Sequence, residues 1–132
     1  LGAIPIPNNK NGMKNFINAI ETHIDRGHPI TIYPEAHIWP FYTKIRPFKA
    51  VSFKYPVQYK KPTFCMTNTY QSYGKNHDKF KVVTYIDGPF FPKDGLSLQE
   101  QKYNLRDQVY NCMVERSKNS NIEMIEYKKL EG

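Results

Sequence analysis

Glu35 lies at a point in the sequence where an active-site carboxylate could be positioned. It follows the apolar, β-branched residues 30–33, and this run stops at Pro34. If the run is a strand of an open parallel sheet, Glu35 lies just beyond its carboxyl end, which is where such sheets bind ligands. His37 follows two residues later and could approach the same site. The alternative is that Glu35 is an exposed turn residue and that His37 packs or orients within the loop.

The positive charge of the chain is concentrated in one segment. The formal net charge is +7, yet residues 36–77 contain no acidic residue. The remaining residues hold 12 basic and 12 acidic side chains, so their charges balance. A focused positive field favours an anionic partner, such as a phosphate, a nucleotide-bearing cofactor or an anionic membrane surface. The alternative is a solvated, lysine-rich face. The basic residues of this segment are Lys44, Arg46, Lys49, Lys54, Lys60, Lys61 and Lys75.

Local sequence signals predict two main helices. Apolar residues recur at helical spacing near residues 12–26 and again near residues 97–116. Asn11 can cap the first helix and Gly27 can end it, whereas residues 97–100, Ser-Leu-Gln-Glu, form a capping box for the second. The pattern also predicts strands near 2–6, 30–33, 62–70 and 80–87, a short helix near 48–55 and a short strand near 122–127.

The order of these elements predicts the α/β fold class. A strand, a helix and a second strand at the start of the chain form a βαβ unit, which implies parallel pairing and a right-handed crossover. We therefore expect a partly parallel sheet flanked by helices. We expect one domain over residues 1–132, with a polar tail from about residue 117. The chain has no starting Met and begins in an apolar stretch, so we expect it to be an incomplete domain cut from a longer protein.

The composition argues against a disulfide-bonded protein, a zinc site, a membrane span and a signal peptide. Cys65 and Cys112 are far apart in apolar contexts, which predicts buried free thiols and a reducing, cytoplasmic compartment. No spacing of Cys and His indicates a zinc site, so we expect no metal. No run approaches the roughly 18 consecutive apolar residues of a membrane span. The first residues also lack the basic region of a signal peptide.

Five segments, in order, resemble sequence blocks of the glycerolipid (1-acyl-glycerol-3-phosphate type, lysophospholipid) acyltransferase family. Residues 33–35, Tyr-Pro-Glu, are similar to the start of Phe-Pro-Glu-Gly-Thr-Arg, the block that binds the acceptor's phosphate in that family. Residues 46–50 look like the Phe-Lys-x-Gly-Ala segment that follows it. Residues 62–66 resemble the Pro-Ile-Val-Pro-Val block, and residues 2–6 fall where an apolar strand with glycine belongs. Residues 86–90 fit the closing strand.

The resemblance implies a set of acceptor-binding residues, with departures. The family's Gly-Thr-Arg is replaced by Ala-His-Ile at residues 36–38, and the earlier block lacks its arginine. Both arginines are phosphate ligands in the family. A guanidinium fork and an ammonium can supply that charge instead. The implied substrate- and phosphate-binding residues are Glu35, His37, Arg46, Lys49 and Ser52.

The resemblance also implies a mechanism whose catalytic base is not in this chain. In the family, the histidine of a His-x-x-x-x-Asp block takes a proton from the acceptor hydroxyl. None of the four histidines here has Asp five positions later. We therefore expect the base upstream of residue 1 and no activity from this chain alone. The expected donor is acyl-CoA or acyl carrier protein, with no other cofactor. The expected acceptor is a lysophospholipid or glycerol phosphate, at the inner face of the membrane.

Other functions and partners stay open at this point. One alternative is a non-catalytic module of the same fold that binds anionic lipid or a protein. Another is a basic nucleic-acid-binding domain, because residues 41–61 interleave basic residues with Phe and Tyr. No RNP-like, KH-like or zinc-knuckle pattern supports it, and we expect no nucleic acid partner. The aromatic residues of 39–42 could form an acyl-chain groove, a membrane contact or loop packing. We also expect self-association over a truncated face that includes residues 3–6 and 30–33.

Overall fold

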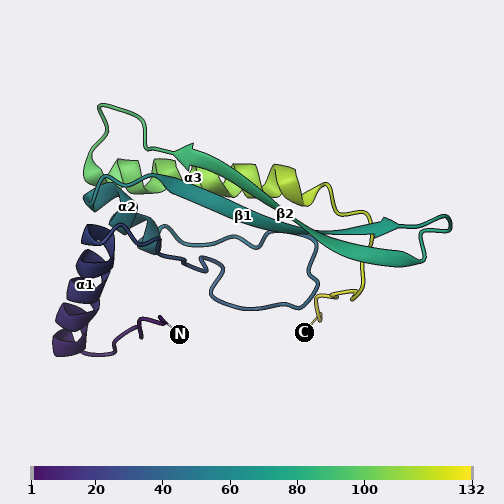
Figure 1. Cartoon of the computed structure of the whole chain (residues 1–132), viewed down its shortest axis with the longest axis horizontal. Helices are drawn as coiled ribbons and strands as arrows, with labels where there is room; N and C mark the ends of the chain where they lie inside the picture. The colour runs from purple at the N-terminus through teal and green to yellow at the C-terminus, as the bar shows by residue number, and fades with distance from the viewer. Residues whose placement is uncertain (1, 132) are drawn as a thin grey trace. The chain divides into compact units, whose positions relative to one another are not determined.

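The computed structural model describes residues 2–131, which divide into a first unit of residues 2–33 and a second unit of residues 34–131 (Figure 1). The first unit contains one helix, α1 (Lys10–Asp25). The second unit contains all the other elements. In chain order these are the 3-10 helix η1 (Val51–Phe53), α2 (Lys54–Gln58), β1 (Thr63–Tyr73), β2 (Lys79–Phe90) and α3 (Leu98–Ser117).

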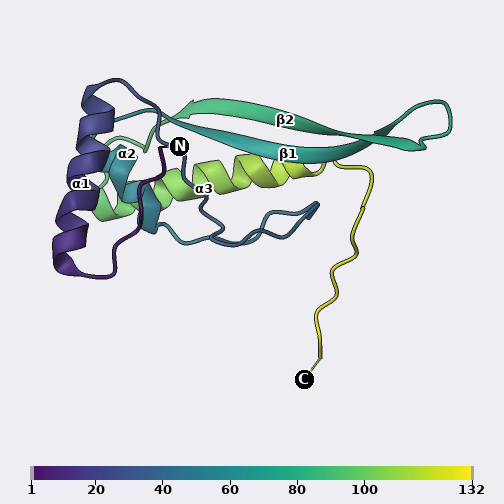
Figure 2. The same ribbon diagram turned by 60° about the horizontal axis from the view of Figure 1, so that its bottom comes forward.

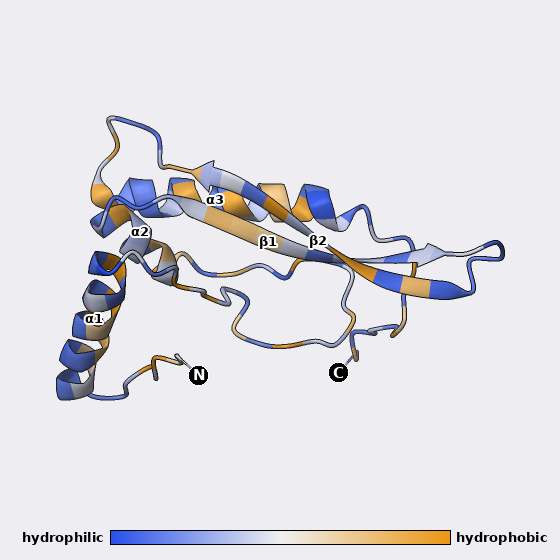
Figure 3. Ribbon diagram, in the orientation of Figure 1, coloured by the Kyte–Doolittle hydropathy of each residue, from blue (hydrophilic) through white to orange (hydrophobic). Residues whose placement is uncertain are grey.

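The helix α1 is amphipathic, and local chemistry sets its ends. The side chain of Asn9 caps it by accepting a hydrogen bond of 2.7 Å from the backbone amide of Gly12. Beyond its last turn, Gly27 adopts a φ of 72°, a conformation that glycine takes without steric cost. Apolar residues gather on one side of the helix (Figure 3). The helix expected near residues 12–26 is confirmed, with its cap at Asn9 and not at Asn11.

The strands β1 and β2 form an antiparallel hairpin with one irregularity. Thr63 pairs with Phe90 and Cys65 pairs with Asp87, so one residue of β1 lies opposite two residues of β2. Gly88 lies in this bulge at a φ of 132°. A Cβ atom on Gly88 would lie 2.8 Å from the carbonyl oxygen of Thr63. Glycine is therefore required here by both the backbone conformation and the close approach of the other strand.

The helix α3 runs along one face of the hairpin (Figure 2) and forms the core with it. Alternate residues of β1, namely Cys65, Thr67 and Thr69, are buried on this inner face. Leu105 and Val109 are the most buried residues of α3, at 0% and 4% exposure. The core cluster consists of Phe48, Phe53, Val57, Cys65, Leu105, Val109 and Met113. The core of the second unit is therefore built by α3 and β1 together with η1, α2 and the residues just before them.

The expected parallel sheet is wrong: the chain has an α+β fold with a two-stranded antiparallel sheet. Only residues 74–78 separate β1 from β2, and a parallel connection needs a crossover of a dozen or more residues. Residues 2–6 and 30–33 are not strands, so the described chain has no βαβ unit. Pro5 and Pro34 lack the backbone donor that a sheet ladder uses. The β-branched residues near Pro34 favour an extended backbone but have no strand to pair with.

Elements specified by nearby residues were predicted well. The strands near 62–70 and 80–87, the helix near 97–116 and the capping box at its start are confirmed. The short helix near 48–55 begins slightly later, at Val51. The short strand near 122–127 is wrong, because these residues form bends and irregular structure. Within residues 2–131, no helix combines the length and the apolar character needed to cross a membrane.

Candidate functional site

The candidate site is the loop of residues 35–46, which is closed by its first and last residues. The carboxylate of Glu35 accepts a hydrogen bond of 2.9 Å from the backbone amide of Arg46. Inside the loop, Ala36 and Phe41 adopt φ values of 61° and 56°. Residues with a Cβ atom rarely adopt this left-handed region, and they keep it only where surrounding contacts impose it. The Glu35 bond is one such contact, so the loop is a constrained structure.

The side chain of Arg46 lies over the indole ring of Trp39. Its guanidinium carbon is 4.2 Å from the ring centroid, which is a cation–π contact. The ring of Tyr127 stacks on Trp39 at a centroid distance of 5.2 Å, and its hydroxyl donates a hydrogen bond of 2.7 Å to the carbonyl of Pro40. The tail that carries Tyr127 therefore helps to hold the loop and the guanidinium in place.

One nitrogen of the Arg46 guanidinium is a buried donor without a partner. Within residues 2–131, Nη1 is shielded from solvent and makes no hydrogen bond. A guanidinium offers five N–H donors in a fixed plane, and leaving one buried and unpaired costs free energy. Acid-free residues 36–77 surround it in the sequence. An anion with a planar or tetrahedral set of oxygens would give this donor a charge-assisted bond.

The structure brings only two of the five sequence-predicted residues into contact. Glu35 and Arg46 meet, although the carboxylate contacts the backbone of Arg46 and not its guanidinium. Lys49 is exposed, Ser52 is half-buried in η1, and His37 is exposed. Among the described residues, no hydrogen bond or ion pair joins these three to Glu35. The expected mouth beyond parallel strand ends is also missing, because residues 30–33 form no strand.

The aromatic residues of the loop are used mainly for packing. The ring of Phe41 makes edge contacts with Tyr70 and Phe80 of the hairpin, at centroid distances of 5.6 and 6.0 Å. Tyr42 packs edge-on against Trp39 at 5.1 Å. Ile38 is the most exposed apolar residue of the loop, at 91%, and Trp39 and Phe41 are also exposed in part, at 42% and 37%. The loop thus rests on the hairpin and still presents apolar surface to solvent.

Two contributions to the chemistry of the chain were missed by sequence reasoning. Tyr127 was placed in a polar tail, although a single aromatic residue in such a tail indicates a contact elsewhere. The second is a group of three potential metal ligands, Cys65, Asp87 and Cys112, which come from three different elements. Burial raises the pKa of the Cys65 thiol to about 12. Burial also raises the pKa of Cys112, and hydrogen bonds from Arg116 lower the pKa of Asp87.

Comparison of the chain with models of known protein families, with curated proteins and with solved structures found no match. A function for the chain therefore has to be argued from the loop of residues 35–46 and the charge around it.

Proposed function

We propose that this chain carries the acceptor-binding part of an acyltransferase. The enzyme would move a fatty acyl group from acyl-CoA or acyl carrier protein to the hydroxyl of a lysophospholipid or glycerol phosphate. The observation that carries this proposal is the buried, unpaired Nη1 of Arg46, in a segment that contains no acidic residue. A phosphate oxygen of the acceptor would be its missing hydrogen-bond partner.

The backbone at Ala36 supports the resemblance to the glycerolipid acyltransferases. That family has glycine after the Pro-Glu pair, where this chain has Ala36. Ala36 adopts a φ of 61°, a conformation that favours glycine. The substitution therefore keeps a backbone shape for which glycine is the natural residue. This agreement is independent of the charge argument, because it concerns only the path of the chain after Glu35.

The proposal gives Glu35, Arg46 and Lys49 separate roles. Glu35 holds the loop closed through the amide of Arg46, and the guanidinium of Arg46 binds the acceptor phosphate. Exposed Lys49 adds positive charge at the solvent side. The histidine of an upstream His-x-x-x-x-Asp block would take the proton from the acceptor hydroxyl. The resulting oxygen attacks the thioester carbonyl, the acyl–oxygen bond forms, the carbon–sulfur bond breaks, and the histidine returns its proton to the leaving thiolate. Fixing the phosphate orients the hydroxyl for this attack.

The proposal places the protein at the inner face of a membrane, where its acceptor and product reside. Ile38 projects almost fully exposed from the loop, and basic Lys44 lies six residues further on. An exposed apolar side chain in a segment rich in positive charge suits the surface of a bilayer with anionic lipids. If this contact is used, Ile38→Ser should reduce co-sedimentation with vesicles of phosphatidylglycerol, and Lys129→Ser, in the tail, should not.

Ligand binding can be tested through Trp39, because it is the only tryptophan in the chain. Titration with glycerol 3-phosphate should change its emission in a saturable way, whereas glycerol should not. Arg46→Met should weaken binding about 10- to 100-fold, the loss expected for one charge-assisted bond. Lys44→Met is the matched control, since it removes a neighbouring exposed charge, and should change the affinity less than twofold. Calorimetry should repeat these titrations, because Arg46→Met also alters the surroundings of Trp39.

Two results would contradict the proposal. An equal response to glycerol and glycerol 3-phosphate, or equal affinities of the Arg46→Met and Lys44→Met variants, would show that Arg46 binds no acceptor phosphate.

In a thiol-release assay with acyl-CoA and lysophosphatidic acid, this chain alone should stay at background and the longer protein should turn over. Robust turnover by residues 1–132 would require another base, and exposed His37 would be the first residue to substitute.

A further inference from the structure

Three side chains able to ligate a metal meet between the hairpin and α3. Cys65 and Asp87 are directly opposite one another on β1 and β2, so their side chains lie on the same face of the sheet. Cys112 comes from α3, which packs on that face. The two sulfurs and a carboxylate oxygen all lie within 4.8 Å of one another. No sequence spacing could indicate this group, because each residue belongs to a different element.

We propose that Cys65, Asp87 and Cys112 form a binding site for a thiophilic divalent cation, with Zn²⁺ as the expected occupant. Tetrahedral Zn²⁺ has bonds of about 2.3 Å to sulfur and about 2.0–2.2 Å to oxygen, which sets its ligand atoms roughly 3.5–3.8 Å apart. The ligand atoms lie within 4.8 Å of one another, so side-chain rotations that move them by about 1 Å reach this geometry. Three protein ligands leave the fourth position for water. This inference does not depend on the acyltransferase proposal.

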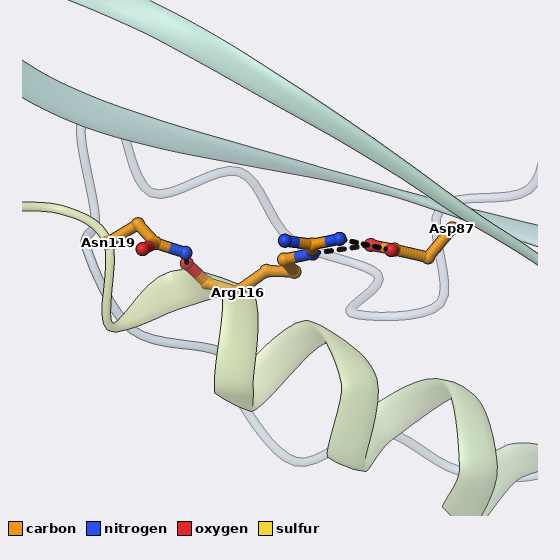
Figure 4. Close-up of polar contacts among 3 residues, drawn as sticks. All are labelled: Asp87, Arg116 and Asn119. Atoms are coloured by element: carbon orange, nitrogen blue, oxygen red, sulfur yellow. Dashed lines mark hydrogen bonds and ion pairs between the residues drawn. The ribbon is translucent and has the colours of Figure 1, made fainter.

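Arg116 orients the carboxylate and balances the charge of the site. Its Nε and Nη2 atoms donate hydrogen bonds of 2.9 and 2.6 Å to the two oxygens of Asp87 (Figure 4). Each oxygen keeps a further lone pair for a cation. Two thiolates and one carboxylate carry three negative charges, and a divalent cation with one guanidinium carries three positive charges. A half-buried site that is neutral overall avoids the cost of an uncompensated charge. Outer partners of this kind commonly fix the ligands of metal sites.

Two buried hydroxyls next to Cys65 give an independent indication of a polar ligand. Thr63 and Thr67 flank Cys65 on the same face of β1. Their Oγ1 atoms are shielded from solvent and have no hydrogen-bond partner among residues 2–131, and Thr67 is only 1% exposed. Buried polar groups are normally satisfied, and a bound ion or ordered water is a common partner where protein atoms are not. A metal-bound water or thiolate would accept hydrogen bonds from these hydroxyls.

The test is titration of the fully reduced chain with Cd²⁺ and Zn²⁺. Cd²⁺ should produce the ultraviolet charge-transfer absorbance of cadmium thiolates, saturating at one equivalent per chain. Zn²⁺ should compete for the same site and raise the unfolding temperature, whereas Mg²⁺ should do neither, because it prefers oxygen ligands. Bound Zn²⁺ should also protect both cysteines from alkylation by iodoacetamide. These measurements use the unmodified chain, so they do not depend on any variant folding.

Variants then identify the ligands. Cys112→Ser should remove at least half of the cadmium absorbance. Asp87→Asn should weaken Zn²⁺ binding about 10- to 100-fold. Asp107→Asn is the matched control, because Asp107 also pairs with an arginine, Arg106, but lies outside the group, and it should bind as the unmodified chain does. Absence of the cadmium band in the folded, reduced chain would overturn the proposal. The proposal would also be overturned if Cys112→Ser left the band intact. It would be overturned too if the reduced chain bound neither Cd²⁺ nor Zn²⁺ and formed a Cys65–Cys112 disulfide when exposed to glutathione disulfide.

Discussion

The carboxylate of Glu35 and the backbone amide of Arg46 are joined by a hydrogen bond of 2.9 Å across the eleven positions that separate them. The bond fixes the backbone of Arg46, from which the guanidinium extends over the ring of Trp39. If Arg46 binds the proposed acceptor phosphate, Glu35 would affect that binding by shaping the loop, without touching the anion. This separates the role of Glu35 from that of Arg46 and allows the two to be tested with different variants.

Glu35→Ala should destabilise the second unit by about 1 kcal/mol, because it leaves the partly buried amide of Arg46 without its acceptor. Glu35→Gln keeps an acceptor oxygen and should cost less than half as much. Urea denaturation followed by circular dichroism measures both. The exchange rate of the Arg46 amide hydrogen should rise in Glu35→Ala and change little in Glu35→Gln. Equal exchange rates in the two variants would show that the carboxylate does not hold this amide.

Tyr127→Ala should expose Trp39 and shift its emission to longer wavelength, because the two rings stack at 5.2 Å. The expected cost is about 0.5–1.5 kcal/mol, the range for an aromatic pair. Tyr127→Phe keeps the stacking and loses only the bond to Pro40, so its emission should stay near that of the unsubstituted chain. Identical spectra for all three proteins would mean that the tail does not rest on Trp39 in solution.

Gly88→Ala should lower the free energy of unfolding by about 2–3 kcal/mol. The added Cβ would lie 2.8 Å from the carbonyl oxygen of Thr63, and the φ of 132° is strained for alanine. Gly95→Ala is the matched control, since Gly95 has a φ of 78° but open space around a Cβ. It should cost only the backbone term of about 1–2 kcal/mol. Thermal unfolding distinguishes the two, and a smaller loss for Gly88→Ala than for Gly95→Ala would contradict the tight bulge.

Because of Glu100, at the start of α3, the free energy of unfolding should fall as the pH is lowered. Hydrogen bonds from the side chain and backbone of Ser97 hold the pKa of Glu100 below its ordinary value. A depressed folded pKa stabilises the native state above the unfolded pKa of about 4.3, and this contribution is lost as the pH falls through the folded pKa. The difference in unfolding midpoint between the native chain and Glu100→Gln should therefore shrink from about pH 6 to pH 3. A difference that stays constant over this range would exclude Glu100 as its source.

Sequence reasoning succeeded where a structure is specified by residues close together. The cap of α3 uses Ser97 and Glu100, which are three positions apart and can be identified from the sequence. The inner face of β1 could not be identified in this way, because the apolar Phe64 and Met66 are exposed and the polar Thr67 and Thr69 are buried. Sequence reasoning also failed on the sheet, because residues 30–33 show strand propensity but pairing depends on a partner elsewhere. The short connection at 74–78 was visible in the sequence and favoured a hairpin over parallel pairing.

The candidate site was partly predictable for the same reason. Glu35 stood out because it follows an apolar run and a proline, and Arg46 because it lies in the acid-free segment. Their hydrogen bond was not predictable, since it depends on the left-handed backbone at Ala36 and Phe41. The stacking of Tyr127 on Trp39 joins positions 88 residues apart and leaves no local pattern. The same holds for the group of Cys65, Asp87 and Cys112.

The hairpin also has a kinetic consequence. Its ladder begins at the pair Tyr73 and Lys79, which closes a short loop at small entropic cost, so the strands can zip from the turn towards Gly88. Docking of α3 must bring Leu105 to strand residues about 40 positions away, which is a slower search. We therefore expect Val83→Ala, in the hairpin, mainly to slow folding, and Leu105→Ala mainly to speed unfolding, in stopped-flow measurements. The hairpin would then serve as the template on which the helix condenses, and the cation ligands would assemble only in that last step.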